Sequence, residues 1–187
     1  MKRNVSLIAL VFLIMEASHA QLKLSPPDKS PMDLSYYPVN YPVLKIQNKV
    51  TEPLIARITY SRPQKNGRLV FGELVEYEKI WRLGANEATE IELFKDILIE
   101  GNKLKKGKYT MYAIPSEDKW TIIFNRETDI WGAFLYDEAK DVLRVDVKTE
   151  KLEEPAENFT MMFEKNTEGA DLLIAWDSVR TTLPFSF

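Results

Sequence analysis

After residue 42 the apolar residues of this chain alternate with polar ones over short stretches. This period of two is typical of β-strands that bury one face. Turn-forming residues separate the stretches, for example at 62–67 and 115–118. The alternating stretches are 44–46, 54–60, 91–93, 109–113, 120–124, 143–147, 159–163, 172–176 and 183–187. The pattern predicts an all-β fold, an antiparallel β-sandwich or jelly roll of about nine strands.

Two further stretches, 72–79 and 136–140, are the only ones that favour short helices, so at most one or two are expected. Residues 43–187 contain no linker and no internal repeat, and we expect one domain there. Residues 21–42 carry five prolines, which exclude a helix or a central strand. This segment is expected to be an extended lead-in, either lying along a sheet edge or acting as a flexible tether.

The first twenty residues have the pattern of a secretory signal peptide. Lys2 and Arg3 precede an apolar run at 5–15, and small residues lead to Ala20. The run is too short to span a membrane, which takes about 20 residues. We therefore expect cleavage after Ala20, a periplasmic or extracellular location, and no membrane anchor.

Charge and composition narrow the chemistry further. The 187 residues carry a formal net charge of −3, and no basic stripe is available for nucleic acid. The chain has no cysteine, and its one histidine, His19, lies in the expected signal peptide. Cleavage would therefore remove Ser-His-Asp and Cys-His catalysis and imidazole or thiolate metal sites. The groups that remain for binding or catalysis are carboxylates, arginines, hydroxyls and amides.

Residues 81–89 are the least ordinary segment, because they gather diverse side chains around a glycine in a long connection between strands. Trp81, Arg82, Asn86 and Glu87 offer an indole face, a guanidinium fork, an amide and a carboxylate. Together these groups are able to hold a sugar or a carboxylated ligand. The alternative is a lid on the sandwich, with Trp81 in the core and Arg82 paired to Glu87.

A second candidate segment spans residues 129–138 and contains Trp131 and Asp137. If Glu87 and Asp137 converge, they form a carboxylate pair of the kind that glycoside hydrolysis uses. Acidic residues in loops are more often simply solvated. No metal site or cofactor is expected, because the acidic spacing at 137–141 does not match a calcium loop. Arg62, at the end of an expected strand, is a further candidate that faces the same loops or caps a turn.

Several strings resemble a known family. They are Tyr60-Ser61-Arg62-Pro63, Gly67-Arg68, Phe71-Gly72, the Trp-Arg-Leu-Gly-Ala-Asn-Glu-Ala-Thr run at 81–89, residues 119–125, Trp131-Gly132-Ala133-Phe134 and Tyr136-Asp137. They are similar to the hallmark segments of the bacterial secreted family catalogued as domain of unknown function 2911, over about 25–187. Residues 28–48 depart from the family's usual leading strand. The resemblance implies a secreted, mostly β domain and carries no activity.

The preferred hypothesis is therefore a non-catalytic β-sandwich that binds a glycan or a small carboxylated ligand. The expected ligand-binding residues lie in the loops 62–72, 81–89 and 129–138 and are Arg62, Trp81, Arg82, Asn86, Glu87, Trp131 and Asp137. One alternative is a hydrolase of glycan-like substrates that uses Glu87 and Asp137 as acid and base. A third is a protein-interaction module of a surface complex, for which an exposed apolar patch would be diagnostic.

Overall fold

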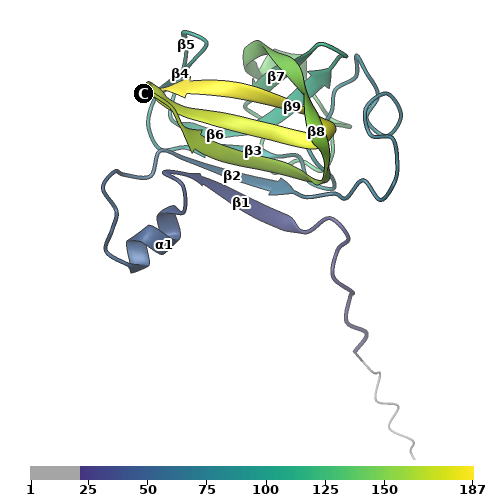
Figure 1. Cartoon of the computed structure of the whole chain (residues 1–187), viewed down its shortest axis with the longest axis horizontal. Coiled ribbons are helices and arrows are strands. Elements are labelled where there is room, and N and C mark those ends of the chain that lie inside the picture. The colour runs from purple at the N-terminus through teal and green to yellow at the C-terminus, as the bar shows by residue number, and fades with distance from the viewer. Residues whose placement is uncertain (1–21) are drawn as a thin grey trace, which may run out of the picture.

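The computed structural model describes residues 22–187, which form an antiparallel β structure (Figure 1). Its strands are β1 (Met32–Tyr37), β2 (Ala56–Ser61), β3 (Glu90–Leu93), β4 (Ile97–Ile99), β5 (Asn102–Leu104), β6 (Gly107–Pro115), β7 (Lys119–Asn125), β8 (Asp141–Lys165) and β9 (Gly169–Ser186). Within this part of the chain one α-helix, α1 (Tyr41–Ile46), and one 3-10 turn, η1 (Glu138–Lys140), accompany them. The all-β prediction is confirmed. The expected signal peptide, 1–20, lies outside the described residues.

The strands are ordered β1-β2-β3-β6-β7-β8-β9-β4-β5, and every pairing is antiparallel. The long strand β8 makes the sandwich possible. Its first residues pair with β7, whereas the rest, from Thr149 on, pairs with β9. Register shifts between Lys151 and Thr160 mark where the pairing of β8 and β9 is irregular, as expected where a strand bends. The sheet thus folds over so that β8 and β9 lie in front of β3 and β6 (Figure 1).

The core lies between the two layers and is rich in aromatic rings. Trp120 and Phe159 are fully buried, and Trp81 and Trp176 are almost so. Trp81 stacks on Trp176 with 6.0 Å between ring centroids and packs edge-on against Trp120 and Phe159. Such pairs add about 0.5–1.5 kcal/mol each beyond their burial. Because no disulfide is available to this cysteine-free chain, burial of this kind supports the fold.

Three local predictions are wrong. Residues 44–46 belong to helix α1, which begins at Tyr41, inside the lead-in thought unable to be helical. Pro42 is tolerated there because the first turn of a helix needs no N–H donors. Residues 72–79 form turns and an isolated bridge between Phe71 and Val75, not a helix.

The alternating stretches also merge where the prediction separated them. The stretches 143–147 and 159–163 both belong to β8, and 172–176 and 183–187 both belong to β9, except for Phe187. β1 adds the edge strand that the lead-in hypothesis allowed. No helix within residues 22–187 has the length and apolarity needed to cross a membrane.

Candidate functional site

The loop that follows β2 crosses the sandwich and is held by β8. The N–H of Phe159 donates to the carbonyl of Pro63 at 2.9 Å, and the N–H of Lys65 donates to the carbonyl of Glu157 at 2.8 Å. These bonds satisfy backbone groups that a wandering loop would leave unpaired. The rest of the loop, residues 66–75, therefore lies next to β9.

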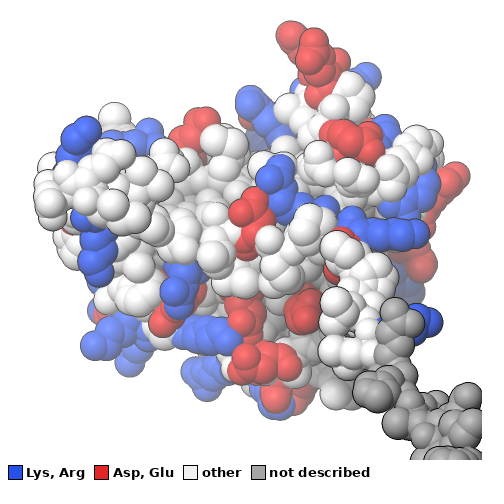
Figure 2. Space-filling model, turned by 90° about the horizontal axis from the view of Figure 1, so that it is seen from below, with Lys and Arg blue, Asp and Glu red and all other residues white. Residues whose placement is uncertain are grey.

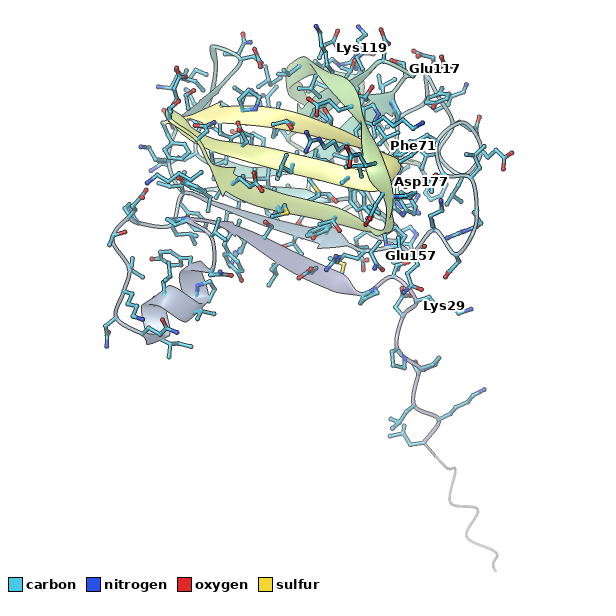
Figure 3. The ribbon with its side chains drawn as sticks, viewed as in Figure 1. Lys29, Phe71, Glu117, Lys119, Glu157 and Asp177 are labelled. Atoms are coloured by element: carbon cyan, nitrogen blue, oxygen red, sulfur yellow. The ribbon has the colours of Figure 1, made fainter. Side chains whose placement is uncertain are left out.

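Asp177 of β9 anchors this loop. Its buried carboxylate forms an ion pair with Lys65 and accepts a hydrogen bond from the N–H of Val70 at 3.4 Å. Figure 3 shows Asp177 beside Phe71, whose ring packs edge-on against Trp176. The charge of Asp177 is thus neutralised within the chain, and its carboxylate holds the loop after β2 against β9.

The segment 81–89 begins as part of the core. The backbone N–H and C=O of Trp81 pair with Ala113, and the indole N–H donates to the carbonyl of Gly84 at 3.2 Å. Gly84 has φ of +140°, and a Cβ there would lie 3.0 Å from the carbonyl oxygen of Ser61. A glycine is required because the loop passes so close to the end of β2. Most of the Trp81 ring therefore lies in the core, as the lid alternative expected of this residue.

A pocket of about 170 Å³ lies where the two loops meet. Trp81 and Trp176 give it an apolar base, and Arg68 and Arg82 bring two cations to its wall. Ser30, from the segment before β1, contributes at one side. The remaining lining residues are Pro63, Leu74, Val75, Gly84 and Ala85.

Arg82 is the unusual member of this pocket. It is half-buried, and its buried Nε has no hydrogen-bond partner among the residues that the structure describes. Within residues 22–187 no carboxylate forms an ion pair with it, so the expected pairing with Glu87 is absent. Burial lowers the pKa of Arg82, because the charged form loses its hydration. A guanidinium nevertheless stays charged at neutral pH.

Arg68 approaches the same pocket from the loop after β2. Its Nε donates to the carbonyl of Lys65 at 2.8 Å, and its Nη2 donates to the carbonyl of Gln64. These neutral acceptors orient the guanidinium without cancelling its charge. Across the described chain, Arg68 likewise lacks an ion pair. The pocket therefore carries two uncompensated positive charges.

Arg62 does not line this pocket. Its Nη1 pairs with Asp33 at 3.0 Å, its Nη2 donates to the hydroxyl of Thr160 at 3.0 Å, and its Nε donates to the carbonyl of Phe159 at 3.2 Å. All three nitrogens are occupied. Arg62 therefore links β1 to β8, and its hydrogen-bond donors are used within the chain rather than free for a ligand.

The loops 81–89 and 129–138 do meet, through their backbones. Glu87 and Trp131 form an antiparallel bridge, and the N–H of Gly132 donates to the carbonyl of Asn86 at 2.9 Å. The Asn86 side chain donates to Asp28 at 2.9 Å. Glu87 is exposed, and Trp131 is 60% exposed. The structure thus brings Asn86, Glu87 and Trp131 together, but outside the lining of the pocket.

Asp137 caps the 3-10 turn η1. Its carboxylate accepts the N–H of Ala139 at 3.0 Å as the N-cap of η1, and its carbonyl accepts from Asn125 at 2.9 Å. The next residues form a network in which Tyr136 donates to Asp141 at 2.6 Å. Arg144 bonds both Tyr136 and Asp141, so its charge is compensated.

Among the pocket residues the sequence singled out Trp81 and Arg82 and missed the others, including Ser30, Arg68 and Trp176. Arg68 follows Gly67 in one of the family-like strings, which offered a signal. Trp176 had none, because its alternating stretch assigns it to the core, where most of its ring does lie. Within residues 22–187, no cluster of three or more His, Cys, Asp or Glu side chains is placed to hold a metal.

Comparison with known protein families identifies a match over most of the chain. The family model described as "Protein of unknown function (DUF2911)" matches residues 42–185, most of the chain. No curated protein and no solved structure shows significant similarity. The match includes the loops that form the pocket and the segment 129–138. The chain belongs to the DUF2911 family of proteins of unknown function.

Proposed function

We propose that this protein binds a small organic anion in the pocket between the loops 62–75 and 81–89, with a carboxylate seated against Arg82. Arg82 is the residue on which this depends, because it is a half-buried cation that no carboxylate of residues 22–187 pairs with. Leaving a buried polar group unpaired costs about 1–3 kcal/mol, and a charge costs more. A ligand carboxylate supplies the missing acceptor.

The chemistry of the wall favours a carboxylate over a neutral ligand. A guanidinium presents parallel N–H groups that match the two oxygens of a carboxylate. Arg68 adds a second cation, and Ser30 is able to bond a hydroxyl or a second oxygen. Since none of the lining residues is acidic, an anion meets no repulsion there. This also leaves the pocket without an acid/base pair, so we propose binding without catalysis.

The volume limits the size of the ligand. A cavity of about 150 Å³ holds benzene, whereas drug-sized ligands take about 300–1,000 Å³. At about 170 Å³ the pocket suits a molecule of similar size to benzoate or a short aliphatic acid. The indoles of Trp81 and Trp176 provide apolar contact for its body. An oligosaccharide does not fit inside, which favours the small carboxylated ligand over the glycan.

Calorimetric titration tests the proposal. The purified protein is titrated with acetate, butyrate, lactate and benzoate, and at least one is expected to bind and to raise Tm. Arg82→Gln should abolish this binding. Arg126→Gln serves as the matched control, because Arg126 is exposed, forms no ion pair with any residue of 22–187, and lies outside the pocket lining. Absence of binding by every acid, or equal loss in the control, would refute the proposal.

We also propose that the protein acts outside the cytoplasm. The charged start, the apolar run at 5–15 and the small residues before Gln21 support removal of residues 1–20. Mass spectrometry of the protein recovered from cell fractions tests this. An N-terminus at Gln21 in the periplasm or the medium is expected, whereas a chain that keeps Met1 in the cytoplasm would contradict it.

A further inference from the structure

Within residues 22–187 the strand β1 has one edge without a partner. There it pairs only with β2, and its sequence Met-Asp-Leu-Ser-Tyr-Tyr contains neither lysine nor proline to discourage further pairing. Met32 and Leu34 are about half exposed on it. Exposed apolar edges of this kind are normally covered, because their free N–H and C=O groups recruit other strands.

A groove of about 250 Å³ runs beside this edge. Its other wall is the part of β8 from Thr160 to Phe163, which pairs with β9 alone. Arg62 bridges the two walls through Asp33 and Thr160. Leu34, Val39 and Met162, each more than 40% exposed, give the groove an apolar part beside the polar residues Asp33, Ser35, Asn40 and Thr160. Figure 2 shows the face seen from below, where charges of both signs are interspersed without a continuous patch of either.

The same chain carries an extended segment without a partner, residues 22–27. All six residues are exposed, and within the described chain none of them makes a hydrogen bond or an ion pair. Leu22 and Leu24 are 82% and 78% exposed and alternate with Lys23, which is the pattern of a strand with one apolar face. Pro26 and Pro27 keep the segment extended.

Hydrogen bonds at its base hinder this arm, residues 22–27, from folding back onto its own chain. Asp28 accepts hydrogen bonds from the N–H of Ser30 and from Asn86, and the carbonyl of Pro31 accepts from the N–H of Arg62. These bonds fix the direction in which the chain leaves β1. Figure 1 shows the arm leading away from the sheets.

We propose that the arm, residues 22–27, covers the β1 edge and groove of a second copy of this chain, and that two copies exchange arms in a symmetric dimer. The main chain of the arm pairs with the free edge of β1, and Leu22 and Leu24 lie against Leu34, Val39 and Met162. An extended segment is the occupant that a strand edge selects. Reciprocal exchange closes the assembly at two copies, because each arm starts beside the groove that receives its partner.

Sedimentation and light scattering of the purified protein test the dimer. The double variant Leu22→Lys and Leu24→Lys should raise the dimer dissociation constant at least about tenfold, because it removes the burial of two leucines. Its matched control is Phe134→Lys with Leu135→Lys, which changes two equally exposed apolar residues, 82% and 77%, on the loop 129–138. A wild-type monomer overturns the proposal, as does a dimer that survives the arm variant or depends on the control residues.

Engineered cysteines locate the contact, since the chain has none of its own. Leu24→Cys and Met162→Cys are prepared as separate proteins and mixed under oxidising conditions. A disulfide-linked heterodimer between them is expected. Leu24→Cys mixed with Leu135→Cys should give only background, and equal yields from the two mixtures would exclude the groove as the receiving site.

Discussion

Arg62 and Arg82 are both half-buried, and both belong to the candidate residues that the sequence singled out, yet their surroundings are opposite. Arg62 has a carboxylate, a hydroxyl and a carbonyl on its three nitrogens. Arg82 has a buried Nε with no partner and no ion pair within residues 22–187. The first arrangement completes the fold, whereas the second leaves a charge that only something outside the described chain is able to neutralise.

The other arginines with assigned partners follow Arg62. Arg57 pairs with Glu92, Arg144 with Asp141, and Arg180 with Glu150. Burial without compensation therefore distinguishes Arg82 more than residue type or loop position does. Perturbed charges of this kind cluster at functional sites because a ligand completes them.

The largest expected change in unfolding free energy comes from Trp81, the tryptophan that lies under the pocket of Arg82. Trp81 lies under the pocket and is 7% exposed, so Trp81→Ala should cost about 3–5 kcal/mol of unfolding free energy. Trp131, 60% exposed, is the matched control, and Trp131→Ala should stay within about 0.5 kcal/mol. Urea denaturation measures both. Similar losses at the two tryptophans would mean that the pocket does not rest on the core.

The second prediction is that replacing Arg62 and replacing Arg82 change the unfolding free energy in opposite directions. Arg62→Met should destabilise the fold by about 1–2 kcal/mol, because Asp33 and the carbonyl of Phe159 lose their partner. Arg82→Met should be neutral or stabilise the ligand-free protein by up to about 1 kcal/mol, since it replaces an uncompensated charge by an apolar side chain. Denaturation in buffer free of carboxylates measures both. A loss at Arg82 as large as that at Arg62 would assign it a structural role.

Sequence patterns predicted the all-β class and the approximate number of strands, because burial of one face imposes a period of two. They failed at residues 41–46, where the first turn of a helix accepts a proline. They also divided β8, because Glu153 to Glu157 interrupt the alternation without ending the strand. β8 continues there because it pairs with β9 on both sides of the interruption.

The site was less predictable than the fold for a related reason. The strings 81–89 and 67–68 pointed to Arg82 and Arg68, but nothing local distinguished Arg82 from Arg62. That difference depends on Asp33, Phe159 and Thr160, which are distant in sequence from Arg62 and come together only through the pairing of β1 and β8 with the loop. Periodicity also does not reveal local caps, so the sequence placed Asp137, whose carboxylate caps η1, among the expected ligand-binding residues.

A smaller effect is expected from the compensated network around Arg144. Burial and the hydrogen bond to Asp141 raise the pKa of Tyr136 to about 12 from its usual 10, so the folded protein holds this proton more tightly than the unfolded chain. The resulting stabilisation is present below about pH 10 and is lost as pH rises toward about 12. After allowance for partial solvent exposure we expect about 1 kcal/mol. Stability curves of wild type and Tyr136→Phe should therefore converge over this window, and parallel curves would contradict it.

The smallest expected effect separates ligand binding from carboxylate catalysis. Glu87 is exposed, lies outside the pocket lining and meets Trp131 only through its backbone bridge. Glu87→Gln should therefore change the unfolding free energy by less than about 0.5 kcal/mol and leave the affinity for a carboxylate that binds wild type unchanged. Calorimetry in parallel with Arg82→Gln, which should lose binding, measures the contrast. Weaker binding in Glu87→Gln would place the ligand across both loops. That would return Glu87 to the site as a group that accepts a hydrogen bond from the ligand, and it would contradict a site confined to the pocket around Arg82.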